Sequence, residues 1–406
     1  MIRIVVFGVP FTGHANPLYP VLRVLLDHGA EVVVVNDESM RERFESTGVR
    51  FRAYPRLPAY RRFFERARPT SMPDLAAGLM SVATATVPFA LRVLDEEQPD
   101  CVLHDSIACW ALLATRARSL TAVGLVTTFA FNLEMSREES SLRSRLRILG
   151  QLVAAFPKLL VRRTAMKARL RTRPLRIFET FMALERTNVV FTSREFQPQS
   201  DLFADRCHFV GTTAVSRHPA VGFPYERLDE RRPVVYISLG TILHRADLLR
   251  RFLDAFASYP AQFVLSLGRT GDPDRLGPIP DNFLVRDYVP QTELLHRVSA
   301  FVTHGGLNSV HESLLAGVPM VVVPLQVEEA IVASRVHECG AGIAVRLDPP
   351  YGAVDEDELR HAIGAVLADE RFAKRAHELG AGLRAAGGAP RAARVILEAA
   401  GSAGPS

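Results

Sequence analysis

The chain has 406 residues, too many for one ordinary domain and suited to two domains of roughly 200 residues each. Hydrophobic residues make up 48% of the chain and charged residues only 23%, which excludes a disordered or fibrous protein. The net charge of +5 is mild, but eleven Arg or Lys and no Asp or Glu lie between Arg143 and Arg176. The basic character therefore belongs to one segment, and the rest of the chain is net acidic.

The first residues, Met1–Phe7, predict a short strand and lack the basic region, long apolar stretch and cleavage site of a secretory signal. The longest apolar candidates elsewhere are interrupted at Pro157, Lys158 or Pro324, so we expect no membrane-spanning run. The four cysteines are scattered, without paired or metal-binding spacing, which is typical of a reducing compartment. We therefore expect a cytoplasmic protein.

Strand-like and helix-like patterns alternate through the first half of the chain, which predicts an α/β fold with a parallel sheet. The predicted strands are Ile2–Phe7, Glu31–Asn36, Val49–Ala53, Cys101–His104, Ala122–Val126 and Asn188–Phe191, and the predicted helices are Pro17–His28, Ser39–Ser46, Pro73–Glu97 and Ser106–Arg116. Because Pro17 is a good first helical residue behind the capping side chain of Asn16, we predict that the first helix begins just past His14.

A linker is predicted between Gly211 and Pro233, where the periodicity is lost and Pro, Gly and charged residues gather. A second α/β unit follows the linker. Its predicted strands are Val234–Ser238, Gln262–Ser266, Phe283–Arg286, Ala300–Thr303 and Met320–Val323, and its predicted helices are Ala246–Ser258, Gln291–Leu295, Leu307–Leu315, Glu329–Cys339, Glu356–Ala368, Arg371–Leu383 and Ala389–Ala399. We divide the chain into residues 1–211, a linker 212–232, residues 233–385, and a C-terminal helix and tail 386–406.

An anion site is predicted where a buried strand ends in His304, Gly305 and Gly306 and a helix begins. The free N–H groups of the helix start point into the turn, the helix dipole favours negative charge, and glycines let the backbone approach a diphosphate. A tight turn with a structural histidine is the alternative. The next strand also ends in polar residues, Gln326, Glu328 and Glu329, at the sheet edge where ligands bind.

These residues resemble a known signature. The pattern His304-Gly-Gly-x-Asn308-Ser309-x-x-Glu312, with an acidic pair at 328 and 329, resembles the nucleotide-binding motif of family 1 glycosyltransferases, specifically the bacterial macrolide-glycosyltransferase-like branch. Further matching segments lie in the expected order along nearly the whole chain: Phe11–Pro17, Asp100–Asp105, Thr192–Pro198, Phe209–Gly211, Ser238–Thr241, Tyr288–Gln291 and Gly317–Pro324. The resemblance implies the GT-B fold, in which two doubly wound Rossmann-like domains face each other across a cleft. Residues 1–211 would bind the acceptor and residues 233–385 the nucleotide sugar.

His14 and Asp105 form the candidate catalytic pair. Both follow predicted strands at one sheet edge, where a neutral imidazole can take a proton from an acceptor hydroxyl and a carboxylate can hold the imidazole tautomer. From spacing alone, a capping histidine and an N-cap aspartate are an equal alternative. The resemblance assigns His14 the role of base and Asp105 that of its partner. We interpret His104 as a packing residue.

The resemblance also implies a set of donor-binding residues. Ser238, Gly240, Thr241, His304, Gly306, Leu307, Asn308 and Ser309 would hold the diphosphate, Tyr288, Val289 and Gln291 the nucleobase, Glu312 the ribose, and Glu328 and Glu329 the sugar. Many family members have Trp in place of Tyr288, which leaves UDP and dTDP both open. Glu329 replaces the usual glutamine, and a carboxylate there suits sugar hydroxyls or an amino group. An acidic helix start is the alternative for this pair.

No metal or other cofactor is expected. Two Asp-x-Asp sequences, at Asp272 and Asp355, are explained as a loop and as an acidic helix start. The basic segment 143–176 predicts amphipathic helices, either with a solvated face or resting on anionic membrane. Nucleic-acid binding is disfavoured because this segment has no stacking aromatics beyond Phe156. A monomer and a homodimer both remain open.

The sequence thus predicts an inverting, metal-independent glycosyltransferase that moves a sugar from a UDP- or dTDP-sugar to a hydroxyl of a lipophilic small molecule of the natural-product or macrolide type. Two alternatives remain. One is a catalytically silent relative that serves another glycosyltransferase as an auxiliary protein, and the other is a sugar-nucleotide epimerase.

Overall fold

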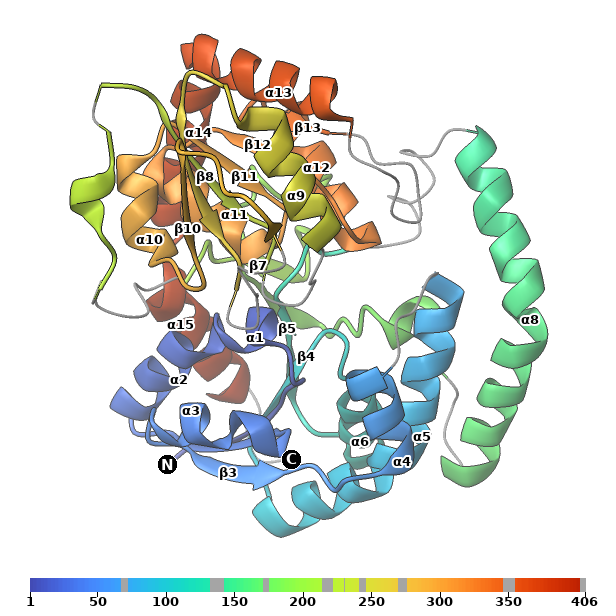
Figure 1. Cartoon of the computed structure of the whole chain (residues 1–406). Coiled ribbons are helices and arrows are strands. Elements are labelled where there is room, and N and C mark those ends of the chain that lie inside the picture. Colours follow the sequence, from blue (N-terminus) through green and yellow to red (C-terminus); the bar gives the residue numbers. More distant parts are fainter. Residues whose placement is uncertain are drawn as a thin grey trace. The chain divides into compact units, whose positions relative to one another are not determined.

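The computed structural model describes residues 1–66, 72–131, 142–170, 175–213, 222–229, 231–240, 246–268, 276–345 and 355–401. The chain divides into two compact units, one made of Met1–Thr213 with Ala386–Ser406 and the other of Ala214–Ala385. Each unit has a parallel sheet flanked by helices (Figure 1), so the predicted α/β class is confirmed for both. The predicted linker 212–232 lies largely in the second unit, and residues 214–221 and 230 are outside the described part of the chain.

The first unit has, within its described residues, a seven-stranded sheet in the order β3-β2-β1-β4-β5-β6-β7. Its strands are β1 Arg3–Phe7, β2 Glu31–Asn36, β3 Arg50–Ala53, β4 Cys101–Asp105, β5 Ala122–Val126, β6 Thr187–Val190 and β7 Cys207–Phe209. Its helices are α1 Thr12–Ala15, α2 Leu18–Asp27, α3 Arg41–Glu45, α4 Pro58–Arg61, α5 Met72–Glu97, α6 Cys109–Arg118, α8 Leu142–Leu170 and α15 Gly388–Gly401, with short turns η1 Glu38–Met40, η2 Arg62–Arg66, η3 Phe178–Thr180 and η4 Ser200–Phe203.

Strands β1, β2, β4 and β5 of this sheet are buried on both faces, which explains their nearly continuous apolar sequences. In β1, Val5 and Phe7 pack on the side of α5 and α6, whereas Ile4 and Val6 pack on the side of α2 and α15. Because successive side chains of a strand alternate between faces, each face of the sheet takes every second residue.

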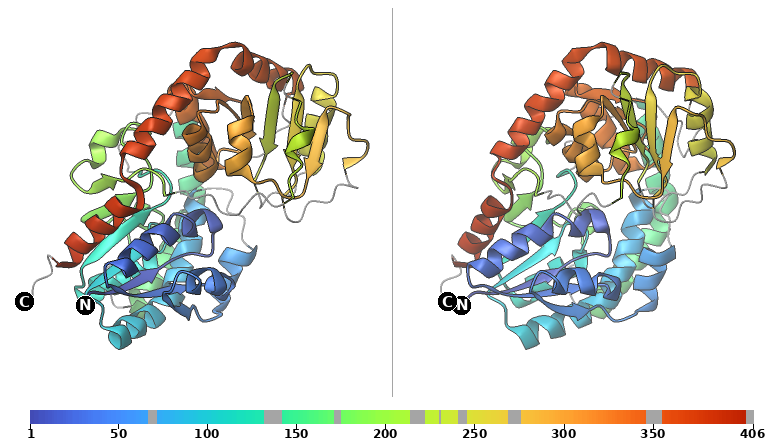
Figure 2. Two further views of the ribbon diagram at one scale, coloured as in Figure 1. Left: turned by 90° about the vertical axis from the view of Figure 1, so that its left-hand side faces the viewer. Right: turned by 60° about the vertical axis from the view of Figure 1, so that its left-hand side comes forward.

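The last helix of the chain, α15, belongs to the first unit. It lies beside α2 (Figures 1 and 2) and buries Ala392, Ala393 and Ile396 in the core on that face of the sheet. The Gly388 N–H donates to the carbonyl of Val210 at 2.7 Å, which ties the start of α15 to the end of β7. The C-terminal segment is therefore part of the core of the first unit.

The second unit has, within its described residues, a six-stranded sheet in the order β10-β9-β8-β11-β12-β13. Its strands are β8 Val234–Ser238, β9 Gln262–Ser266, β10 Phe283–Arg286, β11 Ala300–Thr303, β12 Met320–Val322 and β13 Gly342–Ala344. Its helices are α9 Ala246–Phe256, α10 Gln291–Leu294, α11 Leu307–Ala316, α12 Val327–Glu338, α13 Glu356–Ala368 and α14 Glu370–Ala385, with turns η5 Tyr225–Arg227 and η7 Leu295–Arg297.

Both sheets have the same doubly wound strand order, in which the direction of winding changes at one point. In the first unit β1 lies between β2 and β4, and in the second β8 lies between β9 and β11. The carboxyl ends of two strands that are distant in sequence therefore meet at the switch point, where the loops diverge and ligands bind in such sheets.

The start of the first helix differs from the prediction. His14 does not precede the helix in an open loop but lies within the short helix α1, and the Asn16 N–H donates to the Thr12 carbonyl. Pro17, in a helical conformation, is the residue before α2, so Asn16 does not cap it. The predicted helix Pro17–His28 is confirmed as α2, but the cap at Asn16 and the loop position of His14 were wrong because the chain is already helical from Thr12 onward. The short edge strands β7 and β13 were not predicted.

Helix α5 corrects the expectation that no apolar run could span a bilayer. Among the described residues it is the one helix long and apolar enough to do so by length and composition, over Pro73–Glu97. More than half of its most apolar window is buried, and it packs against α6 and α8. Its apolar character is therefore explained by its position in the core of the first unit.

The contribution of α15 to the first unit can be tested with Ile396→Ala. Because Ile396 is fully buried, we expect the truncation to lower the free energy of unfolding by about 2 to 5 kcal/mol. Denaturant unfolding followed by circular dichroism measures this change. The control Arg394→Ala, on the exposed face of the same helix, should change stability by less than about 0.5 kcal/mol. Equal effects of the two substitutions would contradict the packing described for α15.

Candidate functional site

The structure brings His14 and Asp105 together at the switch point of the first sheet. His14 lies in α1, which follows β1, and Asp105 is the last residue of the neighbouring strand β4. His14 Nδ1 lies 2.8 Å from Asp105 Oδ2, although the two residues are 91 positions apart in sequence. The contact is a direct consequence of the pairing between β1 and β4.

Asp105 selects the tautomer of His14. Its side chain is 1% exposed, and its Oδ1 already accepts the backbone N–H of Ile107 at 2.9 Å. An ionised carboxylate can only accept hydrogen bonds, so His14 Nδ1 must carry the hydrogen in this contact. The lone pair of the neutral imidazole is then on Nε2, which is the arrangement a general base requires.

A third residue, Thr127, contacts the same ring nitrogen and was not predicted. Its Oγ1 lies 2.8 Å from His14 Nδ1, and the residue is 4% exposed. Since Nδ1 carries one hydrogen, Asp105 and Thr127 must share it as acceptors. Thr127 is the first residue after β5, so the rule that polar residues at strand ends form sites could have found it.

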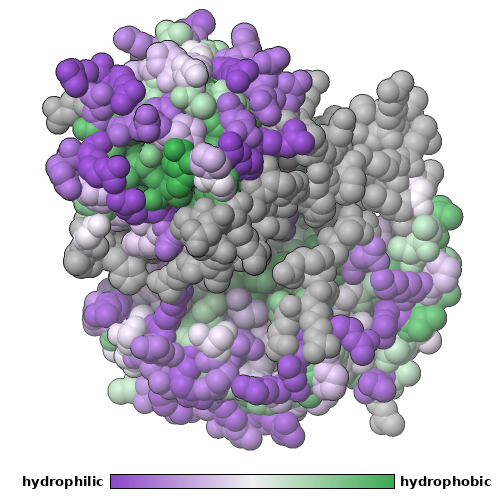
Figure 3. Space-filling model, in the orientation of Figure 1, coloured by the Kyte–Doolittle hydropathy of each residue, from purple (hydrophilic) through white to green (hydrophobic). Residues whose placement is uncertain are grey.

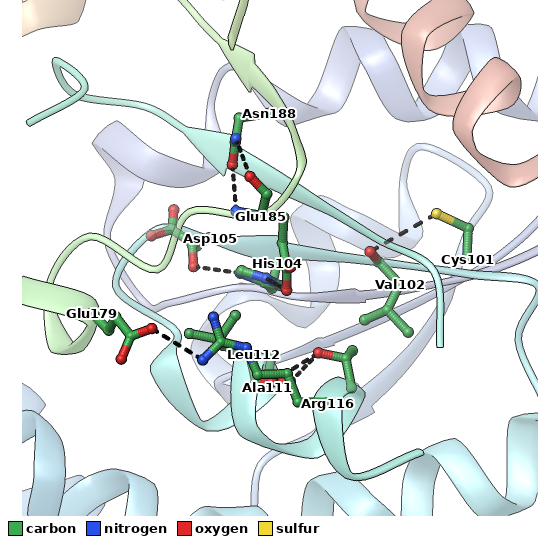
Figure 4. Close-up of polar contacts among 11 residues, drawn as sticks. Cys101, Val102, His104, Asp105, Ala111, Leu112, Arg116, Glu179, Glu185 and Asn188 are labelled. Atoms are coloured by element: carbon green, nitrogen blue, oxygen red, sulfur yellow. Dashed lines mark hydrogen bonds and ion pairs between the residues drawn. The ribbon is translucent and has the colours of Figure 1, made fainter. Parts of the chain in front are cut away.

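His104 supports Asp105 from the opposite face of β4 (Figure 4). It is fully buried, with Nε2 3.1 Å from Glu185 Oε1 and Nδ1 3.2 Å from the backbone carbonyl oxygen of Asp105. Asn188 in turn holds the backbone of Glu185, accepting its N–H at 2.9 Å and donating to its carbonyl at 2.8 Å. His104 is therefore buried as predicted, but it also makes polar contacts that brace the backbone next to His14.

Aromatic side chains surround the loop that carries His14. The Phe11 ring lies 5.7 Å from the His14 ring and 5.5 Å from that of Phe64, measured between centroids. Behind them, Trp110 Nε1 donates to the Tyr54 hydroxyl at 3.0 Å, and this hydroxyl donates to the Gly8 carbonyl at 3.1 Å. His14 therefore lies next to partly exposed apolar rings, which suit an apolar ligand.

Polar residues also meet at the switch point of the second sheet. Ser238 ends β8, and it pairs in register with Ser266 of β9 and Thr303 of β11. The loops that follow β8 and β11 carry Gly240 and His304. Ser266 was not among the predicted site residues, although it too ends a strand.

The glycines of the predicted anion site are required by the packing around His304. Gly305 has a φ of +93°, which side chains rarely adopt. A Cβ on Gly306 would lie 2.7 Å from His304 Nε2, and one on Gly240 would lie 3.0 Å from Cε1 of the same ring. Gly306 is also the residue before α11 and supplies no capping side chain, so the helix start stays open to an acceptor ligand.

His304 is neutral near pH 7. Its side chain is 17% exposed, but burial of the ring lowers the pKa to about 4. Its Nδ1 makes no hydrogen bond to any described residue, and its Nε2 lies 3.9 Å from Glu329 Oε1. A neutral ring can donate one hydrogen bond to a diphosphate but contributes no positive charge. Among the described residues at this site, the N-terminus of α11 is a source of favourable charge for an anion.

Three predicted donor-binding residues form one hydrogen-bond network. Gln291 Nε2 donates to Glu312 Oε2 at 2.7 Å and to Ser309 Oγ at 3.2 Å. The hydroxyl of Tyr236, a buried residue stacked on Phe301, donates to Gln291 Oε1 at 3.3 Å. Both amide hydrogens of Gln291 are thus used within the protein, and only its oxygen retains capacity for a further bond. Tyr236 was not predicted, because it lies inside the strand.

The remaining residues predicted to bind the donor differ in how far their side chains are exposed. Tyr288 is 51% exposed, which leaves its ring face available for stacking, whereas Val289 is buried. Leu307, Asn308 and Ser309 form the first turn of α11. Thr241 lies outside the described residues.

Glu329 is held by the start of α12. It is 4% exposed, and its carboxylate accepts the Leu325 N–H at 2.7 Å and Gln326 Nε2 at 3.2 Å. Burial is the main reason that its pKa is raised to about 7, and the neighbouring Glu328 raises it further. Glu328 itself is exposed. Glu329 thus contacts the start of α12, but it is buried, whereas the alternative for this pair was a solvated acidic helix start.

A metal centre has no obvious ligands in the described part of the chain, where no group of three or more His, Cys, Asp or Glu could hold an ion. Asp355 caps α13 by accepting the N–H groups of Asp357 and Glu358 at 2.9 and 3.3 Å. This agrees with its interpretation as an acidic helix start. Asp272 and Asp274 lie outside the described residues.

Comparison with known proteins gives consistent matches along the chain. The family model described as UDP-glucoronosyl and UDP-glucosyl transferase matches residues 167–381, more than half of the chain. The chain is 30% identical over 405 residues to an uncharacterized UDP-glucosyltransferase, YojK, of Bacillus subtilis, and the match covers 98% of each protein. It is 29% identical over 413 residues to demethyllactenocin mycarosyltransferase of Streptomyces fradiae, covering 98% of this chain and 86% of that enzyme. The crystal structure of the glycotransferase of kitacinnamycin superposes with a TM-score of 0.80 at 26% identity, covering 98% of both chains.

Thr127→Val tests whether Thr127 shares the hydrogen of His14 Nδ1. Loss of one hydrogen-bond acceptor should lower kcat/KM about threefold to tenfold, and Thr127→Ser should restore it. In an Asp105→Asn background the effect of Thr127→Val should be smaller, because the two residues act on one atom. Thr128→Val, at the next position, is the control. Additive effects of Thr127→Val and Asp105→Asn, measured by steady-state kinetics, would show that the two contacts are independent.

Glu329→Gln should stabilise the protein increasingly as the pH rises. Because the pKa of Glu329 is raised in the folded protein, the carboxyl ionises at a lower pH in the unfolded chain than in the folded one. The free energy of unfolding therefore falls as the pH rises from 4.5 to about 7, and the loss is complete above pH 7. The substitution removes that loss. The difference in free energy of unfolding between the variant and the wild type should therefore be larger at pH 8 than at pH 4, by on the order of 2 to 3 kcal/mol. Thermal unfolding of both proteins at the two pH values measures this difference. If the gain were the same at both pH values, or appeared also in Glu328→Gln, the burial of this carboxylate would not be its cause.

Proposed function

The chain belongs to the UDP-glucoronosyl and UDP-glucosyl transferase family, and on that premise we propose that it transfers a sugar from a UDP- or dTDP-sugar to a hydroxyl of a lipophilic small molecule, with inversion and without a metal ion. It is a hexosyltransferase of the macrolide-glycosyltransferase-like branch, and its fold is GT-B. The observation that carries the proposed chemistry is the contact between His14 and the buried Asp105.

The first unit supplies the base. With Nδ1–H donated to Asp105 and Thr127, His14 Nε2 takes the proton of the acceptor hydroxyl as its oxygen attacks the anomeric carbon of the donor sugar. The bond between that carbon and the diphosphate breaks, and the diphosphate leaves with the electron pair. A single displacement of this kind inverts the anomeric configuration. Asp105 then stabilises the imidazolium by its negative charge.

The second unit holds the donor. The open N-terminus of α11 and the neutral ring of His304 are suited to a diphosphate. In our proposal Asn308 and Ser309 contact the diphosphate, Glu312 the ribose, the ring of Tyr288 the base, and Glu328 the sugar. The first-turn N–H groups and dipole of α11 would stabilise the leaving diphosphate, so the mechanism requires no divalent ion.

An apolar acceptor is supported by two observations. Phe11 and Phe64 lie beside the base and are only partly buried. The mycarosyltransferase relative is named for demethyllactenocin as its acceptor, and we propose a natural product of similar apolar character here. The scattered thiols, without paired spacing, support a cytoplasmic reaction.

The test is acceptor-dependent release of UDP or dTDP from a panel of neutral and amino-sugar donors with hydroxylated apolar acceptors. We expect turnover that falls about 10²- to 10⁴-fold in His14→Ala and persists in excess EDTA. The product should have the anomeric configuration opposite to the donor's, measured by NMR. His28→Ala, an exposed histidine of the same unit, is the matched control and should retain activity.

The alternatives give different results in the same assay. Nucleotide binding without turnover on any donor would indicate a catalytically silent auxiliary protein. An altered sugar nucleotide formed without acceptor would indicate an epimerase. Loss of turnover in EDTA that is restored by a divalent ion would contradict the metal-independent mechanism.

A further inference from the structure

Helix α8 is attached to the first unit by one narrow stripe. Its inward residues Ala155, Leu159, Met166 and Leu170 pack against the core cluster that contains α5. Their spacing of four, seven and four residues places them on one side of a helix. Lys158 adds an ion pair to Asp74 at the start of α5, with 2.6 Å between Nζ and Oδ1. The helix is therefore held on one side, and its other side is free of the core.

The free side carries an exposed apolar patch. Val153, Phe156, Leu160 and Val161 are 67%, 62%, 53% and 64% exposed, and their spacing places them on one face. The described part of the chain has eight exposed large hydrophobic side chains, so half of them lie within about two and a half turns of one helix. Figure 3 shows apolar side chains at the right-hand edge, where α8 runs in Figure 1. Such a concentration marks an interaction surface rather than scattered surface residues.

Positive charge accompanies the patch. Between Leu142 and Leu170 the sequence contains no Asp or Glu. Arg162, Arg163, Lys167 and Arg169 are exposed, and among the described residues none of them makes an ion pair, in contrast to Lys158. The helix thus presents apolar side chains together with uncompensated basic ones.

We propose that the free side of α8 docks on an anionic lipid surface. Val153, Phe156, Leu160 and Val161 enter the boundary between headgroups and acyl chains, while Arg163 and Lys167, which flank them on the helix, contact lipid phosphates. The chemistry of the two sets of side chains selects this occupant. The apolar side chains need a dehydrated environment, and the basic ones need an anionic partner.

Other occupants fit less well. A second copy docked through the same patch would bring the basic side chains of two α8 helices into one interface to which neither helix contributes an Asp or Glu, which is unfavourable. A nucleic acid would satisfy the charges but would leave three aliphatic side chains and a single aromatic one without a stacking role. Docking on a membrane is separate from the glycosyltransferase reaction, and it would deliver lipophilic molecules to the enzyme from the bilayer in which they partition.

Vesicle co-sedimentation of the full chain tests the proposal without any activity measurement. The two probes are vesicles of phosphatidylcholine alone and vesicles of phosphatidylcholine with phosphatidylglycerol. We expect binding to the anionic vesicles that weakens at high salt, and little binding to the neutral ones. Arg163→Gln with Lys167→Gln should weaken binding by roughly 25-fold, since each basic side chain near an anionic surface contributes about fivefold.

Matched variants distinguish vesicle binding through α8 from binding through other parts of the surface. Arg231→Gln with Arg371→Gln removes two basic side chains that are 93% and 91% exposed elsewhere, and it should bind like the wild type. Phe156→Ser with Leu160→Ser should abolish binding to both kinds of vesicle, whereas Ile279→Ser, at an exposed apolar residue outside α8, should not. Thermal unfolding of each variant verifies that it is folded.

Three results would overturn the proposal. One is wild-type binding that is absent or indifferent to lipid charge and salt. Another is an equal loss of binding in the α8 variants and their controls. The third is a dimer in solution that becomes monomeric in Phe156→Ser with Leu160→Ser while vesicle binding is absent, because the patch would then join two copies of the chain.

Discussion

The strand order of the two sheets is the constraint on which both candidate sites depend. Each sheet changes winding direction at one point, next to β1 in the first unit and next to β8 in the second. At these points the loops after neighbouring strands run to opposite faces of the sheet, so the edge is left open to polar side chains and ligands. His14 and Asp105 meet at the first switch point, and Ser238 and His304 follow the strands of the second. The same architecture thus places the proposed base in one unit and the proposed anion site in the other.

The two sites handle charge in different ways. In the first, a buried carboxylate faces an imidazole directly, and this contact sets the tautomer. In the second, His304 is kept neutral by burial, and the backbone of α11 supplies the favourable potential. A fixed helix start costs little reorganisation when a diphosphate binds or leaves, because its dipoles already point at the ligand. Neither unit needs a second charged side chain at its centre.

The glycines around His304 show how closely the turn is packed. Gly240 and Gly306 face the imidazole from two sides, and a side chain at either position would collide with it. These residues are therefore required by the ring as much as by any ligand. Buried Glu329 completes the same region by holding the turn that leads into α12. A residue that the family resemblance assigns to the donor sugar thus also has a structural role here.

The sequence by itself determined most strands and helices, because apolar runs and the polar residues that follow them are visible as local patterns. It also identified His14, Asp105 and His304 as candidates, since each lies at or just beyond the end of a predicted strand, whereas Gln291 was named from the family resemblance. Only the tertiary structure decided that Thr127 reaches His14, that Tyr236 holds Gln291 and that Glu185 braces His104. These contacts join residues 55 to 113 positions apart, and such pairings depend on strand order and register. Likewise α15 joins the first unit because its apolar face completes the core beside α2, a partnership between the two ends of the chain that no local pattern contains.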